Sequence, residues 1–242
     1  MRYITPANTI GNRFKNSNHP NWDTLVIIFR DRGSHIIKEA IKSKEYRSPV
    51  FSGIDAKNTS FLNLKNINVG VIDHCMWGGP QASILVEEAS EIGIKKIIGV
   101  GACGSLSEKI QKGSLVIARS SFNTDGTSKV YQTINKSEPS KCLLKLAKSV
   151  DHLNPIPAQA VCIDALYRET KELIESFIKI GGEVINMESS AFYATSMLCK
   201  VESLWIGCVS DSLVGDKWKD WSKTDEMSYQ SGLLCREILQ KL

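Results

Sequence analysis

Runs of apolar residues alternate along the chain with segments whose apolar residues recur every three or four positions. The runs predict buried strands, and the periodic segments predict helices. The predicted strands cover residues 24–29, 67–73, 95–101, 113–118, 158–163, 183–186 and 204–209, with short strands near residues 50 and 51. The predicted helices cover about residues 34–43, 81–92, 138–151, 168–180, 187–199 and 224 to the end. This alternation indicates an α/β fold, a single domain with a central mixed β-sheet flanked by helices.

The first 22 residues are polar and show no sustained periodicity. Such a stretch predicts a loosely held, irregular N-terminal arm. The alternating pattern begins at about residue 23 and continues without a linker or an internal repeat. We therefore expect an arm at residues 1–22 and one domain over residues 23–242.

The composition is that of an ordinary globular protein. The 242 residues are 42% hydrophobic and 23% charged, and the net charge is +4. Basic residues are dispersed among acidic ones, so we expect no nucleic-acid partner. The longest apolar runs fall far below the ~20 residues of a membrane span, and the first residues lack the apolar segment of a signal peptide, so we expect no membrane partner.

Seven cysteines are scattered through predicted core elements, and none belongs to a CxxC pair. An odd number without paired spacing argues against a disulfide framework and against a zinc site. Buried thiols of this kind are typical of a reducing compartment, so we expect a cytoplasmic protein without a bound metal.

Three predicted strands end in polar or glycine-rich segments. After residues 97–100, Gly101 and Gly104 lack a Cβ, so backbone N–H groups can approach a ligand closely. We interpret this segment as a glycine-rich loop at the carboxyl end of a strand, where open α/β sheets bind ligands. Glu188 and Asp211 follow the other two strands. Taken singly, each carboxylate fits a helix cap better than a site residue, and a tight turn is the commoner explanation of such glycines.

The strand at residues 24–29 leads into a short polar loop. Residues 30–33 contain a glycine, and Ser34 is placed to cap the next helix. This arrangement suits an anion bound at a helix N-terminus. It suits an ordinary turn with solvated charges equally well, and both interpretations stay open.

Four segments stand together in the order and approximate spacing of a known family. They are Gly78-Gly79-Pro80 with Val86-Glu87-Glu88, Gly101-Ala102-Cys103-Gly104, Asn186-Met187-Glu188-Ser189, and Ser210-Asp211. In these segments the chain resembles the nucleoside phosphorylase/nucleosidase family of hexameric purine nucleoside phosphorylase, uridine phosphorylase and methylthioadenosine nucleosidase. The resemblance spans about residues 24–240 and implies a nucleoside phosphorylase-like fold.

The resemblance implies cleavage of the N-glycosidic bond of a nucleoside through an oxocarbenium-like transition state. Glu188 matches the family's ribose-binding glutamate, whose carboxylate accepts hydrogen bonds from two sugar hydroxyls. Met187 matches the methionine that packs on the sugar. Asp211 matches the aspartate that, in the purine-cleaving members, gives a proton to N7 of the base. We therefore expect a purine-like nucleoside as the small-molecule partner.

The same comparison implies a base pocket. Cys103 and Gly104 match positions that line it, and Leu166 or Tyr167 falls where an aromatic residue stacks on the base. The remaining substrate-binding candidates are neighbours of the matched positions, namely Ala102, Ile185 and Ser210.

The chain departs from the family where the phosphorylases hold phosphate. Arg30 stands in place of a glycine in the first loop, and Ser34 in place of an arginine. Gly99 replaces a second arginine, and Ala102 replaces a hydroxyl residue. Lys44 matches a basic residue that a neighbouring subunit supplies.

A phosphate dianion without bidentate arginines would be held poorly. We therefore favour a hydrolytic, phosphate-independent reaction, with Arg30, Lys44 and Gly101 as candidates for the phosphate or nucleophile pocket. Phosphorolysis to base and ribose 1-phosphate, with phosphate as co-substrate, is the alternative, and no other cofactor is expected. A second alternative is a nucleoside-binding protein that has kept the fold and lost turnover.

Further departures concern the purine and nucleosidase branches. The purine enzymes carry an arginine about a dozen residues after the aspartate, whereas this region holds Lys217, Lys219 and Lys223. The nucleosidases use an N-terminal glutamate, and no glutamate precedes Glu39 here. The resemblance also implies a homodimer or homohexamer whose pockets are completed across the interface, with His19 a weak match for the histidine that reaches the neighbour's 5′ hydroxyl.

Overall fold

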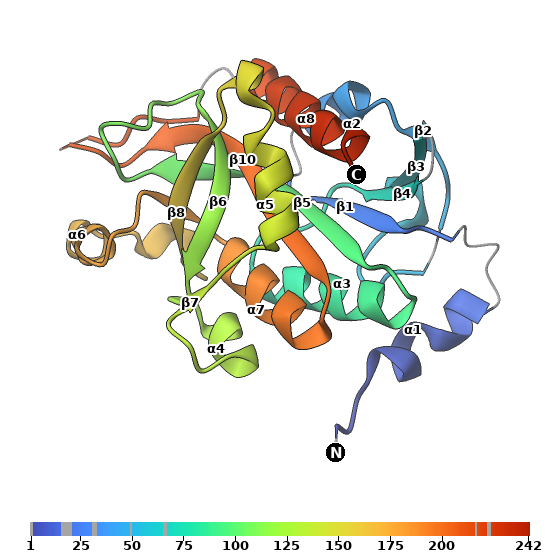
Figure 1. Cartoon of the computed structure of the whole chain (residues 1–242). Coiled ribbons are helices and arrows are strands. Elements are labelled where there is room, and N and C mark those ends of the chain that lie inside the picture. Colours follow the sequence, from blue (N-terminus) through green and yellow to red (C-terminus); the bar gives the residue numbers. More distant parts are fainter. Residues whose placement is uncertain are drawn as a thin grey trace.

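The computed structural model describes residues 2–15, 21–30, 33–48, 50–64, 67–215, 217–221 and 224–242. Within these residues the strands form one mixed sheet, and helices cover both of its faces (Figure 1). The predicted α/β fold with a central mixed sheet flanked by helices is confirmed.

The sheet is built around β5. Its strands are β1 (Thr24–Ile28), β2 (Lys44–Glu45), β3 (Thr59–Leu64), β4 (Ile67–Ile72), β5 (Lys96–Ser105), β6 (Leu115–Phe122), β7 (Lys136–Ser137), β8 (Ile156–Cys162), β9 (Val184–Asn186) and β10 (Glu202–Ser212). They are ordered β10-β6-β8-β9-β5-β1-β4-β3-β2, and β7 pairs with β6. Strand β5 pairs in parallel with β1 and β10 and antiparallel with β9. Because β10 also pairs with β6, strands β5, β10, β6, β8 and β9 close into a ring.

Two helical layers enclose the sheet. The α-helices are α1 (Pro6–Lys15), α2 (Ser34–Ile41), α3 (Gly79–Glu91), α4 (Gly126–Tyr131), α5 (Lys141–Lys148), α6 (Lys171–Lys179), α7 (Ser189–Cys199) and α8 (Thr224–Gln240). Short 3₁₀ turns cover Ala56–Asn58, Asp151–Leu153 and Leu166–Arg168. Helices α2, α5 and α8 lie on one face, and α3 and α7 lie on the other (Figure 1). No helix in the described ranges combines the length and apolar character needed to cross a membrane.

Alternate residues of β1 enter two separate cores. Leu25 and Ile27 belong to the core beneath α3 and α7, and Val26 and Ile28 belong to the core beneath α2 and α8. Successive side chains of a strand point to opposite faces, so a strand that is covered on both faces is apolar throughout. This explains the uninterrupted apolar runs from which the strands were predicted.

The segment predicted as a glycine-rich loop is instead the second half of β5. At Gly101 an added Cβ would lie 2.8 Å from the Trp205 ring. Gly104 pairs with Ile185 of β9 and with Asp211 of β10. These glycines are therefore placed where neighbouring side chains take the space of a Cβ, and the chain does not turn there.

The N-terminal stretch is not irregular throughout, because residues 6–15 form α1 and bury Ile10. Trp22 is also buried, and its indole lies against Gly70 of β4, where an added Cβ would clash. His19 lies outside the described residues. The division of the chain at residue 22 stays a prediction.

Other boundaries also differ from the prediction. Val50 and Phe51 are buried but belong to no strand; the Phe51 ring stacks on Trp22 with centroids 6.4 Å apart. Their apolar character thus reflects a buried loop. The sequence pattern did not reveal β3. It also predicted no element over residues 120–136, which contain the end of β6, helix α4 and the first residue of β7.

Candidate active site

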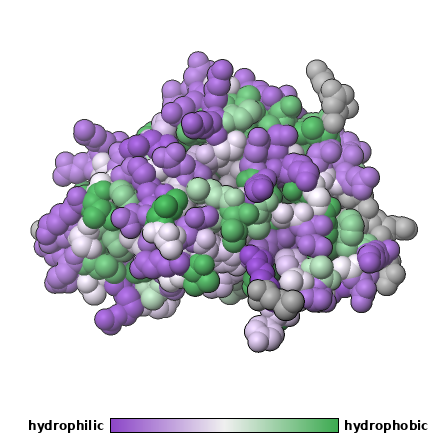
Figure 2. Space-filling model, turned by 60° about the horizontal axis from the view of Figure 1, so that its bottom comes forward, coloured by the Kyte–Doolittle hydropathy of each residue, from purple (hydrophilic) through white to green (hydrophobic). Residues whose placement is uncertain are grey.

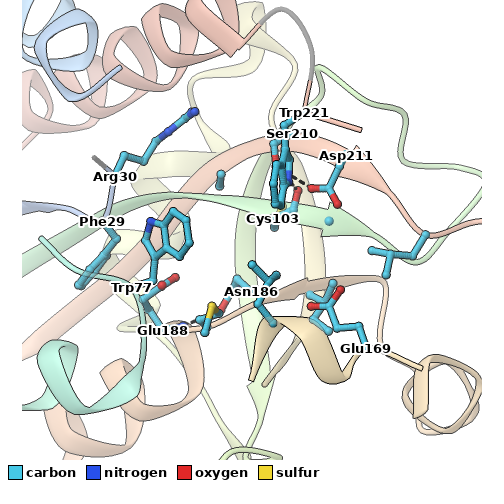
Figure 3. Close-up of a pocket in the computed structure, with 16 residues that line it drawn as sticks. Phe29, Arg30, Trp77, Cys103, Glu169, Asn186, Glu188, Ser210, Asp211 and Trp221 are labelled. Atoms are coloured by element: carbon cyan, nitrogen blue, oxygen red, sulfur yellow. Dashed lines mark hydrogen bonds between the residues drawn. The ribbon is translucent and has the colours of Figure 1, made fainter. Parts of the chain in front are cut away.

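A cavity of about 530 Å³ lies at the carboxyl ends of β1, β5 and β10, beside the start of α7 (Figure 3). Its lining residues are Phe29, Arg30, Trp77, Ala102, Cys103, Gly104, Leu166, Glu169, Ile185, Asn186, Met187, Glu188, Ser210, Asp211, Leu213 and Trp221. We call the part lined by Phe29, Arg30, Trp77 and Glu188 the Glu188 end. We call the part lined by Cys103, Glu169, Asp211 and Trp221 the Asp211 end.

Glu188 is fixed by the start of α7. The Asn186 side-chain oxygen accepts hydrogen bonds from the backbone N–H groups of Glu188 and Ser189, at 3.1 and 3.0 Å. The Gly78 N–H donates to Glu188 Oε1 at 3.1 Å. These contacts aim the carboxyl group into the cavity, where only 4% of the residue is exposed.

Burial raises the pKa of the Glu188 carboxyl group from 4.5 to about 7, and the hydrogen bond from the Gly78 N–H limits that rise. The group is therefore close to the balance point between its charged and neutral forms at neutral pH. A ligand hydroxyl that donates to it would favour the carboxylate.

Asp211 is presented by an irregularity in β10. The register between β10 and β5 shifts between Val209 and Asp211, which is the effect of a β-bulge that re-aims a side chain. The Ser210 hydroxyl donates to Asp211 Oδ1 at 2.7 Å, and the Trp218 indole N–H donates to Oδ2 at 2.8 Å. Hydrogen bonds to both oxygens fix the orientation of the carboxyl group.

The wall of the Asp211 end is mainly apolar. Ile185 and Leu213 belong to a small hydrophobic cluster, and Leu166 also lines the cavity. Burial raises the pKa of the Cys103 thiol well above its usual range, so Cys103 is a neutral group here. A flat heterocycle would meet apolar surface on these sides and carboxyl groups at its edge.

Most of the predicted site residues meet in this cavity. Both carboxylates line it, together with the predicted Met187, Ser210, Cys103, Gly104, Ala102, Ile185, Leu166 and Arg30. Three predicted residues, Tyr167, Gly101 and Lys44, lie elsewhere. Tyr167 is 95% exposed and does not line the cavity, whereas Leu166 does. Gly101 packs against Trp205 inside the sheet.

Lys44 lies on the short edge strand β2 and is exposed. It was predicted to serve the pocket of a neighbouring subunit, and that role stays a prediction. Arg30 is 9% exposed, and its Nη1 donates to Cys208 Sγ at 3.6 Å. Among the described lining residues, Arg30 is the only cationic one.

The prediction missed six lining residues: Phe29, Trp77, Glu169, Asn186, Leu213 and Trp221. Trp77 adjoins a matched segment and Asn186 belongs to one, so both could have been found from the resemblance. Phe29 ends a predicted strand. Glu169 and Trp221 lie in loops, where no local pattern marks a site residue. In the described part of the chain, no group of three or more His, Cys, Asp or Glu side chains is arranged to hold a metal ion.

The family model of the phosphorylase superfamily matches residues 30–240, so this chain belongs to the phosphorylase superfamily. A protein of Acanthamoeba polyphaga mimivirus is 35% identical over 160 residues, 64% of this chain and 62% of that protein. The guanosine phosphorylase of Halorubrum lacusprofundi is 28% identical over 158 residues, 62% of this chain and 64% of the enzyme. The matched region thus spans less than two thirds of the length of either relative.

Solved structures show the same fold. The 5′-methylthioadenosine/S-adenosylhomocysteine nucleosidase of Helicobacter pylori superposes with a TM-score of 0.75 at 15% identity, covering 92% of this chain and 100% of the nucleosidase. Uridine phosphorylase of Vibrio fischeri superposes with a TM-score of 0.74 at 18% identity, covering 91% of this chain and 92% of that enzyme. Proteins of this fold therefore include a nucleosidase as well as a phosphorylase.

Proposed function

We propose that this protein cleaves the N-glycosidic bond of a purine-like nucleoside. The observation that carries the proposal is the meeting of Glu188 and Asp211 in one cavity, although they come from separate elements of the chain. One carboxylate is placed to hold a sugar, and the other lies beside an apolar slot suited to a heterocycle. A guanosine phosphorylase among the relatives supports a purine nucleoside as substrate.

In this proposal the sugar lies at the Glu188 end. Glu188 Oε1 already accepts a hydrogen bond from Gly78, and the carboxylate retains further lone pairs for sugar hydroxyls. As the glycosidic bond breaks, positive charge develops on the sugar ring. A nearby buried carboxylate stabilises that charge more strongly than it would in water.

The base lies at the Asp211 end and receives a proton as it departs. Proton transfer of this kind typically contributes ~10²–10⁴-fold to the rate. Asp211 is the acid that the family resemblance assigns to this step. Its two hydrogen bonds, from Ser210 and Trp218, fix its orientation toward the cavity.

We infer that water is the nucleophile. Arg30 alone is cationic among the described lining residues, and Phe29 and Trp77 add aromatic surface beside it. A phosphate dianion would lose its hydration there and gain a single guanidinium, which already donates to the buried Cys208 Sγ. Phosphorolysis is the second candidate, because Arg30 does face the cavity and a relative is a phosphorylase.

A phosphate titration separates the two reactions. Guanosine, inosine and adenosine are incubated with the protein over a series of phosphate concentrations, and base and sugar products are separated by chromatography. We expect base release at a rate that does not change with phosphate, together with free ribose. A rate that rises in proportion to phosphate, with ribose 1-phosphate as product, would replace hydrolysis with phosphorolysis.

The binding-protein alternative predicts a different result. It requires that no purine nucleoside release its base, while nucleosides still bind to the wild type and to Asp211→Asn with the same affinity. Turnover that Asp211→Asn abolishes removes this alternative.

Assembly as a homodimer or homohexamer is also proposed. Figure 2 turns forward the side of the molecule that carries α3, α4 and α7, and apolar residues lie there among hydrophilic ones. Exposed large apolar side chains on these helices include Ile84, Val130 and Met197. Light scattering at several protein concentrations would give the oligomeric state.

A further inference from the structure

The Asp211 end holds a second carboxyl group, that of Glu169, which the family resemblance does not mark. Glu169 follows the 3₁₀ turn Leu166–Arg168 and lines the cavity together with Asp211 (Figure 3). It is half-buried, and among the described residues none contributes a hydrogen bond to its carboxyl group. Asp211, in contrast, accepts hydrogen bonds at both oxygens.

The charges around Glu169 favour its neutral form. Burial, and then the negative charge of Asp211 on β10, raise the pKa of Glu169 from 4.5 to about 7. Glu188 on the start of α7 and Arg30 after β1 lie at the opposite end of the cavity (Figure 3). On its own segment, Arg168, Lys171 and Glu172 are exposed to solvent, and Cys103 of β5 is a neutral thiol.

Two carboxyl groups in one cavity are thus in opposite situations. Asp211 accepts two hydrogen bonds. Glu169 accepts none from the described residues, and its burial and the nearby negative charge of Asp211 favour its protonated form. Pairs of acids whose surroundings separate them in this way divide the acid and base roles of a site between them.

We propose that Glu169 and Asp211 form an acid pair in which Glu169 carries the proton that the leaving purine receives and Asp211 carries the negative charge. This inference rests on the proposed function and refines its protonation step. Glu169 is then a catalytic residue of the Asp211 end, and Asp211 keeps it protonated.

The step balances as follows. The C1′–N9 bond breaks, and its electron pair passes into the purine ring. The proton on the acid pair moves to a ring nitrogen, so that the base leaves as a neutral molecule and the pair carries two negative charges. The oxygen of water bonds to C1′ and releases one proton, and the pair takes up one proton from solvent.

The decisive experiment compares two substrates in the variant Glu169→Gln. Guanosine needs a proton on its leaving base, whereas 7-methylguanosine already carries a methyl group and a positive charge at that position. We expect Glu169→Gln to slow guanosine cleavage by ~10²-fold and to leave 7-methylguanosine cleavage nearly unchanged. Glu175→Gln, on the exposed side of α6, is the matched control and should leave both rates unchanged.

The pH profile gives a second readout. Guanosine cleavage by the wild type should fall above pH about 7, as Glu169 loses its proton. This alkaline fall should be absent from the residual rate of Glu169→Gln. Equal slowing of both substrates, or an alkaline fall that persists in Glu169→Gln, would overturn the proposal while leaving the proposed function intact.

A third measurement does not need turnover. The protein is labelled with carbon-13 at its glutamate side-chain carboxyl groups, and the resonance that disappears in Glu169→Gln is assigned to Glu169. We expect this resonance to titrate near pH 7 in the wild type and at lower pH in Asp211→Asn. Titration at the usual pH of a glutamate overturns the acid pair whether or not the protein is active. If the resonance titrates as expected and neither substrate is cleaved, the proposed function fails and the pairing of the two acids stands.

Discussion

The two ends of the cavity hold their carboxyl groups by different means. At the Glu188 end, a backbone group holds the carboxyl group: the Gly78 N–H donates to the Glu188 carboxyl oxygen, and the Asn186 side chain caps the start of α7. Backbone donors are fixed by the fold itself. The contacts that a sugar would make are therefore set by α3 and α7, which pack on each other beneath the sheet.

At the Asp211 end, side chains do the positioning. Asp211 lies at the register shift in β10 and accepts hydrogen bonds from Ser210 and Trp218. Glu169 belongs to a loop, and no described residue donates a hydrogen bond to its carboxyl group. Side-chain donors can be replaced without altering the backbone. The comparison suggests that the sugar-binding geometry follows from the fold, while the protonation chemistry depends on a few exchangeable side chains.

The largest expected effect is that of Asp211→Asn, which keeps the shape of the side chain and removes its charge. We expect guanosine cleavage to fall by ~10²–10⁴-fold. Removing the negative charge should also lower the pKa of Glu169, because that charge is one of the two causes of its rise. The alkaline fall in the residual rate of guanosine cleavage should therefore lie at a lower pH than in the wild type.

The profile is measured with guanosine between pH 5 and pH 9, with Glu175→Gln as the control. An alkaline limb at the same pH in Asp211→Asn and in the wild type would mean that the two acids do not interact. The Asp211 end would then hold two independent acids rather than a pair.

A smaller loss of activity is expected for Glu188→Gln, and its effect on stability is more informative. Removing a charge-assisted hydrogen bond costs up to ~3 kcal/mol, or about 10²-fold in kcat/KM. The folded-state pKa of Glu188 lies above its value of 4.5 in the unfolded chain. The stability that the neutral form provides is therefore complete below pH 4.5 and is lost as the pH rises through about 7.

Glutamine cannot ionise, so Glu188→Gln should not lose stability in this window. At pH 8 the variant should exceed the wild type in free energy of unfolding by up to ~3 kcal/mol relative to the difference at pH 4. Urea unfolding at several pH values measures this, and subtraction of the two curves removes the shared contribution of Glu169. Curves that stay parallel from pH 4 to pH 8 would show that the Glu188 end does not bury a charge.

The same division explains what the sequence could reveal. Glu188 and Asp211 follow apolar runs that are buried on both sides of the sheet, so their places at strand ends were visible from periodicity. Their shared cavity was anticipated only through the family resemblance. The predicted boundaries of β1 and β4 agree with the observed ones to within one residue, because burial alone determines these strands.

Other features depend on contacts that no local pattern contains. Gly101 was interpreted as part of a loop, yet its role is to make room for the Trp205 ring, which lies more than a hundred residues away. Glu169 acquires its character from burial and from Asp211, and its own neighbours in the sequence are unremarkable polar residues. The helix α1 was missed because its only buried side chain is Ile10, which gives too little periodicity to recognise.

The smallest expected effect is that of Trp218→Phe, which removes the indole N–H that Asp211 accepts and keeps an aromatic ring against Trp221. Trp218 is 52% exposed, so water can partly replace the lost donor. We expect the activation free energy of guanosine cleavage to rise by about 1 kcal/mol, which is roughly a fivefold fall in kcat. Tyr229→Phe is the matched control, because Tyr229 is an exposed aromatic residue of α8 that does not line the cavity, and it should alter neither kcat nor the pH profile. If both variants lowered kcat equally, a general effect of aromatic substitution rather than the lost hydrogen bond to Asp211 would explain the loss, and the contribution of side-chain donors at the Asp211 end would have to be abandoned.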